Sequence, residues 1–155
     1  MNTYIWGLDL SLSNTGISIF DLNGNIKKIT NIKTNNKETH GLRLKCIANK
    51  ILEMIIEFPP EKIIIERGFS RFNISTAVLY RTHGVINYLL CDYEQIYYTI
   101  KTIKKIILNG SATKQQIWAK ILSVYPDISF ENNNESDSCA VGITYFIKKG
   151  IINWK

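Results

Sequence analysis

The fold of this chain is decided by the sequence WGLDLSLSNTG at residues 6–16. The apolar residues before Asp9 are typical of a strand in the centre of a sheet, where a buried carboxylate is costly. An ionised Asp9 needs a strong partner there, and a divalent cation is the usual one. The small polar residues that follow predict a tight turn, whose backbone a metal ion or a phosphate can approach closely. Metal-dependent nucleases and nucleotide-binding ATPases both fit this local pattern.

The size and charge of the chain narrow the class of protein. Its 155 residues suit one domain, residues 1–155. It has no run of 18 apolar residues, so we expect no membrane partner. The formal net charge of +6 favours a polyanion as partner. The three cysteines are too far apart for a zinc site or a disulfide framework, so we expect buried free thiols and a reducing cytoplasm.

Turn signals and apolar periodicity predict five strands and four helices. Asn23-Gly24 is a strong hairpin signal between the second and third strands, and Pro59-Pro60 ends the first amphipathic helix. We predict neither a helix nor a strand for the basic segment 101–105. The expected strands cover residues 4–10, 15–21, 26–34, 62–66 and 94–99, and the expected helices cover about 39–58, 73–90, 113–124 and 134–149.

A strand–helix–strand connection makes a parallel crossover, so the strand at 62–66 should lie beside the first strand. Asp9 and Glu66 would then face one another at the carboxyl edge of the sheet. The order of elements resembles that of an RNase H-like domain. The expected fold is therefore α/β, with a five-stranded mixed sheet, three antiparallel strands followed by parallel ones, and helices on both faces.

A third carboxylate comes from the start of the last helix. Asn134 and Asp137 are three residues apart and share one helix face, whereas Glu135 points elsewhere. Asp137 would then reach over the sheet to join Asp9 and Glu66. Three carboxylates this close repel one another unless cations hold them, and oxygen ligands suit Mg²⁺ or Mn²⁺. Two such ions, about 3.5–4 Å apart, clamp a scissile phosphodiester.

Four short motifs in register make the chain similar to a known family over nearly its whole length. They are GLDLS at 7–11 with Thr15-Gly16, IIERGF at 64–69, GSATK at 110–114 and ESDSCA at 135–140. Together they resemble the RuvC-type Holliday-junction resolvases, in the short form found in phages. The resemblance implies a Mg²⁺-dependent endodeoxyribonuclease with two ions per active site, which Mn²⁺ also supports. It further implies a homodimer that nicks four-way DNA junctions symmetrically in a bacterial or phage-infected cytoplasm.

The resemblance also suggests roles for individual residues. Asp9, Glu66 and Asp137 are the expected catalytic carboxylates and metal ligands. Asn134 stands where the family commonly has an aspartate; its carbonyl oxygen can still bind a metal ion, and Glu135 is the alternative fourth acid. Phe69 would stack on bases at the opened crossover, and Lys114 would contact phosphate. The full set of candidate DNA contacts is Phe69, Arg67, Arg71, Lys104, Lys105 and Lys114.

Three alternatives stay open at this point. An actin-like or sugar-kinase ATPase shares the first motif, but it needs two such domains around a nucleotide. A broader branch-cutting phage nuclease would keep the chemistry with relaxed selectivity. A non-catalytic DNA-binding module would follow if Asn134 leaves the site too weak for metal. The sequence does not decide the cleavage preference.

Overall fold

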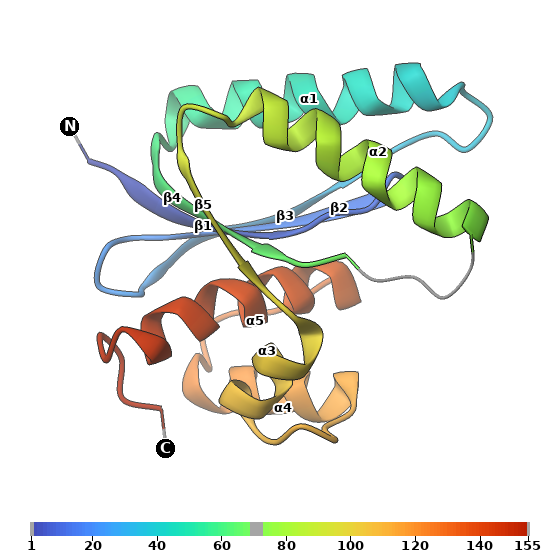
Figure 1. Ribbon diagram of the computed structural model, residues 1–155. Coiled ribbons are helices and arrows are strands. Elements are labelled where there is room, and N and C mark those ends of the chain that lie inside the picture. Colours follow the sequence, from blue (N-terminus) through green and yellow to red (C-terminus); the bar gives the residue numbers. More distant parts are fainter. Residues whose placement is uncertain (1, 69–72, 155) are drawn as a thin grey trace.

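The computed structural model describes residues 2–68 and 73–154, and its sheet has the predicted mixed topology (Figure 1). The first three strands pair antiparallel, and the last two add to the first strand in parallel. The order across the sheet is β3-β2-β1-β4-β5. The strands are β1 (Tyr4–Asp9), β2 (Asn14–Phe20), β3 (Ile26–Lys33), β4 (Pro60–Glu66) and β5 (Glu94–Tyr98).

Helices cover both faces of the sheet, as predicted (Figure 1). The helices α1 (His40–Glu57) and α2 (Asn73–Leu89) lie on one face. On the other face α5 (Asn133–Lys148) packs directly on the strands, and α3 (Ile100–Ile107) and α4 (Lys114–Val124) lie outside it. Because alternate residues of a strand face opposite ways, Ile5 and Ile64 pack toward α5, while Trp6 packs toward α1 and α2.

Glycines bring α5 unusually close to the strands. A Cβ on Gly7 would lie 2.3 Å from the backbone oxygen of Ser138, and a Cβ on Gly16 would lie 2.0 Å from that of Asn134. On the helix side, a Cβ on Gly142 would meet the ring of Phe20 at 2.3 Å. The N-terminal turns of α5 are therefore held against the carboxyl end of β1.

The prediction of four helices was wrong, because the segment given no structure forms α3. Thr99 caps this helix by accepting a hydrogen bond from the backbone N–H of Thr102, and Ile103 and Ile107 are buried on its inner side. Both signals are in the sequence, but they cover only two turns. None of the helices in the part of the chain that the structure describes is long and apolar enough to cross a membrane.

The cysteines are free thiols, as expected, but only one of them is buried. Cys139 lies in the core, Cys46 is partly buried and Cys91 is exposed in the turn after α2.

Candidate active site

Two of the predicted carboxylates end neighbouring parallel strands. Leu8 pairs with Ile65, and the next residues along β1 and β4 are Asp9 and Glu66. Two residues before Asp9, Gly7 faces the backbone of α5. Since the side-chain direction repeats every second residue, Asp9 and Glu66 both point toward the α5 side of the sheet.

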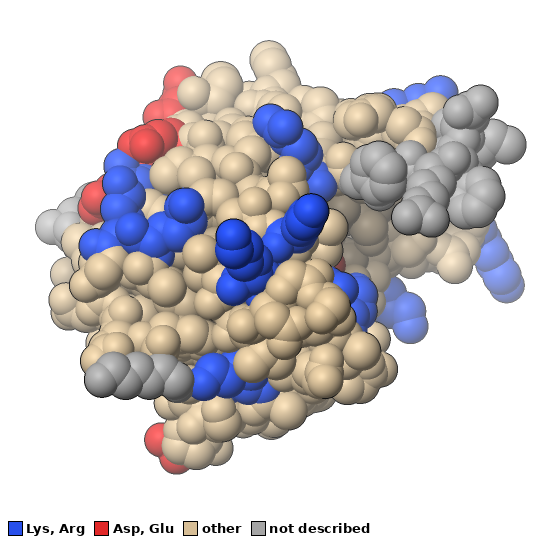
Figure 2. Space-filling model, turned by 60° about the horizontal axis from the view of Figure 1, so that its bottom comes forward, with Lys and Arg blue, Asp and Glu red and all other residues tan. Residues whose placement is uncertain are grey.

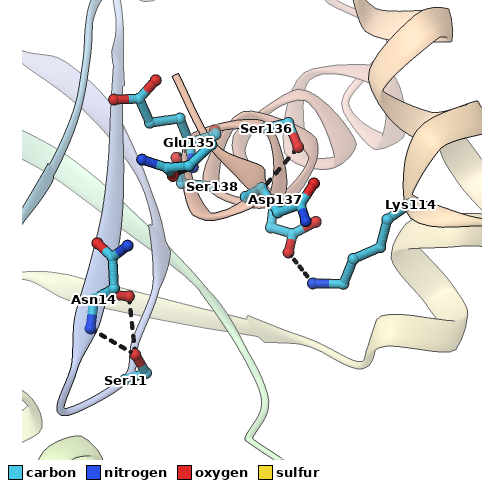
Figure 3. Close-up of polar contacts among 9 residues, drawn as sticks. Ser11, Asn14, Lys114, Glu135, Ser136, Asp137 and Ser138 are labelled. Carbon is cyan, nitrogen blue, oxygen red and sulfur yellow. Dashed lines mark hydrogen bonds and ion pairs between the residues drawn. The ribbon is translucent and has the colours of Figure 1, made fainter. Parts of the chain in front are cut away.

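The third carboxylate comes from α5 and is paired with a lysine from α4. Asp137 is only 8% exposed, and its Oδ2 accepts a hydrogen bond from Lys114 Nζ in an ion pair. Figure 3 shows the two side chains reaching toward one another from their helices. Lys114 is the first residue of α4, which Thr113 and Gln116 begin with a capping box. The cap therefore fixes the point from which the lysine reaches Asp137.

The acidic groups influence one another's protonation. Burial, together with the nearby charge of Asp137 and against the opposing charge of Lys114, raises the pKa of the Asp9 carboxyl to about 7. Burial, together with the charges of Asp9 and Asp137, likewise raises the pKa of Glu66 to about 8. Two carboxyls that hold protons near neutral pH mark a site that lacks compensating positive charge.

A narrow cleft of about 10 Å³ lies beside Glu66 and Asp137. Its polar lining consists of Glu66, Asp137, Lys104 and Lys114, and isoleucines of α3 and α4 complete its walls. This volume holds no more than about one water molecule. A substrate phosphate therefore needs the side chains to move apart, and the ion pair of Lys114 with Asp137 forms part of the wall of the cleft.

As the side chains stand, no three His, Cys, Asp or Glu residues within 2–68 and 73–154 are arranged to hold a metal ion. The structure brings the three acids near enough for their charges to affect one another, but it does not arrange them as a ready-made ligand cage. Their chemistry still fits hard cations, because all three offer carboxylate oxygens. Their charge requires positive compensation, which Lys114 supplies in part.

The two candidates for a fourth ligand have different environments. The backbone of Asn134 lies against Gly16, and Gly16 pairs with Asp9 in the sheet. Glu135 is 5% exposed, and its carboxylate accepts hydrogen bonds from Asn31 Nδ2 at 3.1 Å and from the backbone N–H of Glu131 at 2.7 Å. The carboxylate of Glu135 therefore stabilises the entry to α5.

The turn after β1 is held by its own small polar side chains (Figure 3). Ser11 Oγ donates to the backbone oxygen of Asn14 at 2.9 Å, and Thr15 Oγ1 donates to that of Ser11 at 2.8 Å. Gly16 makes room for α5, so the small residues also serve packing. Asn14 Oδ1 is buried without a hydrogen-bond partner in the described structure. Sequence reasoning missed this oxygen because it considered only the turn backbone.

The predicted DNA contacts occupy three settings. Lys104 and Lys114 line the acidic cleft, whereas Lys105 is exposed on the outer side of α3. Arg67, just after β4, lines a separate cavity of about 420 Å³ beside α2. Phe69 and Arg71 lie outside the described residues.

Comparisons with known proteins agree with this geometry. Residues 5–145 match the family model for crossover junction endodeoxyribonuclease RuvC. The RuvC of Ehrlichia canis is 30% identical, with 92% of this chain and 96% of that protein covered. The RuvC of Rickettsia akari is 32% identical, covering 76% of this chain and 78% of that protein.

The solved structures confirm the predicted fold. Thermus thermophilus RuvC in complex with a Holliday junction substrate superposes with a TM-score of 0.84 at 17% identity, covering 95% of this chain and 94% of that one. A second T. thermophilus RuvC structure gives 0.81 at the same identity, covering 96% and 98%. The resemblance found from the four motifs is therefore confirmed, and the chain belongs to the RuvC family of crossover junction endodeoxyribonucleases.

Proposed function

We propose that this protein is a structure-selective endonuclease that resolves Holliday junctions by metal-dependent hydrolysis of phosphodiesters. The proposal rests on membership of the RuvC family, whose nucleases depend on divalent metal ions in general. The observation that carries it is the position of Asp9 and Glu66 at the ends of neighbouring parallel strands, with Glu66, Asp137 and Lys114 lining one cleft. Under this proposal the sheet and both helical layers act as one nuclease domain.

Asp9, Glu66 and Asp137 would hold two Mg²⁺ ions, and Mn²⁺ would also serve. Asn134 would supply the fourth metal-binding side chain, because its backbone lies against Gly16, which pairs with Asp9 in the sheet. Glu135 is the weaker candidate, since ligation would cost its two hydrogen bonds. Bound divalent ions would lower the pKa of a water nucleophile and stabilise charge on the leaving oxygen.

The chain's own residues prepare the site for a phosphate. Lys114 neutralises part of the acidic charge and keeps Asp137 in place. A metal ion held by Asp137 would take the place of Lys114 in this ion pair, and the Lys114 ammonium would then be free to contact a phosphate oxygen of the substrate. Lys104, which also lines the cleft, would hold a second phosphate oxygen. Arg67 and the loop residues Phe69 and Arg71 would contact the opened crossover.

We also propose a homodimer, because a four-way junction presents two equivalent cleavage positions. The exposed side of α2 is the proposed interface. Tyr80 and Tyr88 are 60% and 83% exposed, and Gly84 lies between them with no atom within 4 Å of its Cβ position. Exposed tyrosines with a small residue between them form a surface that a second helix can approach closely. Tyr88→Glu should therefore dissociate the dimer in sedimentation experiments.

A cleavage assay on a mobile four-way junction with mapped nicks tests the function. Paired symmetric nicks with Mg²⁺ or Mn²⁺ are expected. Asp9→Asn, Glu66→Gln and Asp137→Asn should each abolish nicking and leave junction binding nearly intact. Wild-type nicking rates in any of these variants would remove that residue from the site. Lys114→Ala should weaken binding and lower its salt dependence, because phosphate contacts release counterions.

The same substrates separate the alternatives. A broad branch-cutting nuclease would cut three-way junctions and flaps as fast as four-way junctions, with scattered nicks. A non-catalytic module would bind the junction without cutting it in either metal. Family membership does not favour the ATPase reading, and ATP turnover without nicking would be needed to revive it.

A further inference from the structure

A second basic surface lies outside the cleft, on the layer formed by α3, α4 and the end of α5. Residues 95–126 contain five lysines and no acidic residue, and residues 138–155 contain three lysines and again no acid. Figure 2 shows lysine and arginine side chains spread over this face, with acidic side chains at its margin. Positively charged side chains therefore also cover a surface outside the cleft.

The outer face of α3 is the centre of this surface. Ile103 and Ile107 turn into the core, so Lys101 and Lys105, one turn apart, project outward and are exposed. The ammonium of Lys148, from the end of α5, lies 5.7 Å from the centre of the Tyr98 ring. Tyr98 ends β5 two residues before α3 begins, so Lys148 extends the same face. We call Lys101, Lys105 and Lys148 the α3 surface.

These lysines are not explained by the stability of the protein. None of the three forms an ion pair with an acid among the described residues. Lys101 occupies the first turn of α3, which contains no acid, and a positive charge there opposes the helix dipole. Lys105 and Lys148 lie in the last turns of α3 and α5, where a positive charge is favourable. Only Lys101 is therefore unfavourably placed. The charge of Lys101 is unfavourable to its own helix and is not offset by an ion pair, which points to a role in binding.

The α3 surface is continuous with the proposed catalytic cleft. Lys104 lines the cleft together with Glu66 and Asp137, and it is the neighbour of Lys105 on the same helix. Lys101 and Lys105 are about 6 Å apart along the helix axis, which is nearly two nucleotide steps on one DNA strand. A strand held by Lys104 at the cleft can therefore continue across the outer face of α3.

We propose that the α3 surface binds the phosphate backbone of a duplex arm that leaves the cleft. The inference deepens the proposed function and rests on it for the position of the cleaved strand. The surface adds affinity for duplex DNA without taking part in hydrolysis. It also predicts that the arm lies over the α3 and α4 layer, not over α1.

The test compares two triple variants that lose the same charge. Lys101→Gln/Lys105→Gln/Lys148→Gln removes the α3 surface. Lys27→Gln/Lys45→Gln/Lys50→Gln, in β3 and in α1 on the opposite layer, is the matched control. Affinity for a four-way junction and for a plain duplex is measured by fluorescence anisotropy between 50 and 200 mM salt without divalent metal. Each phosphate contact contributes a slope of about 0.9 in log Kd against log salt.

Loss of three contacts should lower the slope by about 2.7 on both DNAs, so that the ratio of variant to wild-type Kd shrinks about fortyfold over this range. The control should keep the wild-type slope. Single-turnover nicking at saturating protein should be unchanged in the control. If Lys148→Gln disturbs folding, the Lys101→Gln/Lys105→Gln double variant should lower the slope by about 1.8.

An unchanged slope in the α3 variants, or an equal loss in the control, overturns the inference. Failure of the wild-type protein to nick junctions would instead remove the proposed function. The plain duplex keeps the two results distinguishable, because its binding is measured without any cleavage.

Discussion

Replacing Asp9 by asparagine should stabilise the metal-free protein, and increasingly so as the pH rises. In the folded protein, burial and the charge of Asp137 raise the pKa of Asp9 from 3.8 to about 7. Between those values the folded state keeps a proton that the unfolded chain has released. The free energy of unfolding of the wild type therefore falls as the pH rises through this window. The variant has no such proton to lose.

The size of the effect follows from the two pKa values. From pH 5 to pH 8, linkage through Asp9 alone removes about 2.6 kcal/mol from the stability of the wild type. Solvent at the partly exposed carboxylate, together with its coupling to Glu66, reduces this figure toward about 2 kcal/mol. For a chain of this length the difference in Tm between Asp9→Asn and wild type should grow by about 4–10 °C.

Thermal melts in EDTA at pH 5, 6, 7 and 8 measure this difference. Asp92→Asn, at an exposed acid in the turn after α2, is the control and should melt in parallel with the wild type. Added Mg²⁺ should raise the Tm of the wild type at pH 8 and have little effect on Asp9→Asn. If Asp9→Asn and wild type melt in parallel across this range, Asp9 does not carry the unfavourable charge inferred from its burial.

Three further substitutions test the rest of the site. Lys114→Met removes the cation paired with Asp137; nicking should fall at least tenfold, while the half-exposed lysine should cost only about 1 kcal/mol, a Tm change of about 2–4 °C. Gly16→Ala would place a Cβ 2.0 Å from the backbone oxygen of Asn134, so stability should fall by about 1–3 kcal/mol and nicking should be lost. Gly41→Ala, with open space around it, is the control and should be neutral or stabilising by up to about 1 kcal/mol in urea titrations. Asn134→Asp adds a carboxylate at the proposed fourth ligand position and should lower the Mg²⁺ concentration that gives half-maximal nicking. An unchanged requirement would remove residue 134 from the metal site.

The sequence by itself determined the strand order of the sheet and the positions of Asp9 and Glu66 at its edge. Period-two and all-apolar patterns, the hairpin at Asn23-Gly24 and the helix between β3 and β4 specify strand order through local rules. A parallel crossover then brings the ends of β1 and β4 together, so Asp9 and Glu66 become neighbours although 57 positions separate them. These inferences needed only backbone geometry and hydrophobic periodicity.

Only the tertiary structure decided how the third acid and its partners are arranged. The sequence predicted that Asp137 would reach over the sheet, but the close packing of α5 that allows it depends on the glycines at 7, 16 and 142 and is known only from the structure. Lys114 meets Asp137 because two capped helices start at neighbouring places, and Glu135 turns to Asn31 across 104 residues. These contacts form between side chains that are distant in sequence. They depend on how the helices pack and on which charged groups come together, and local sequence patterns do not specify either.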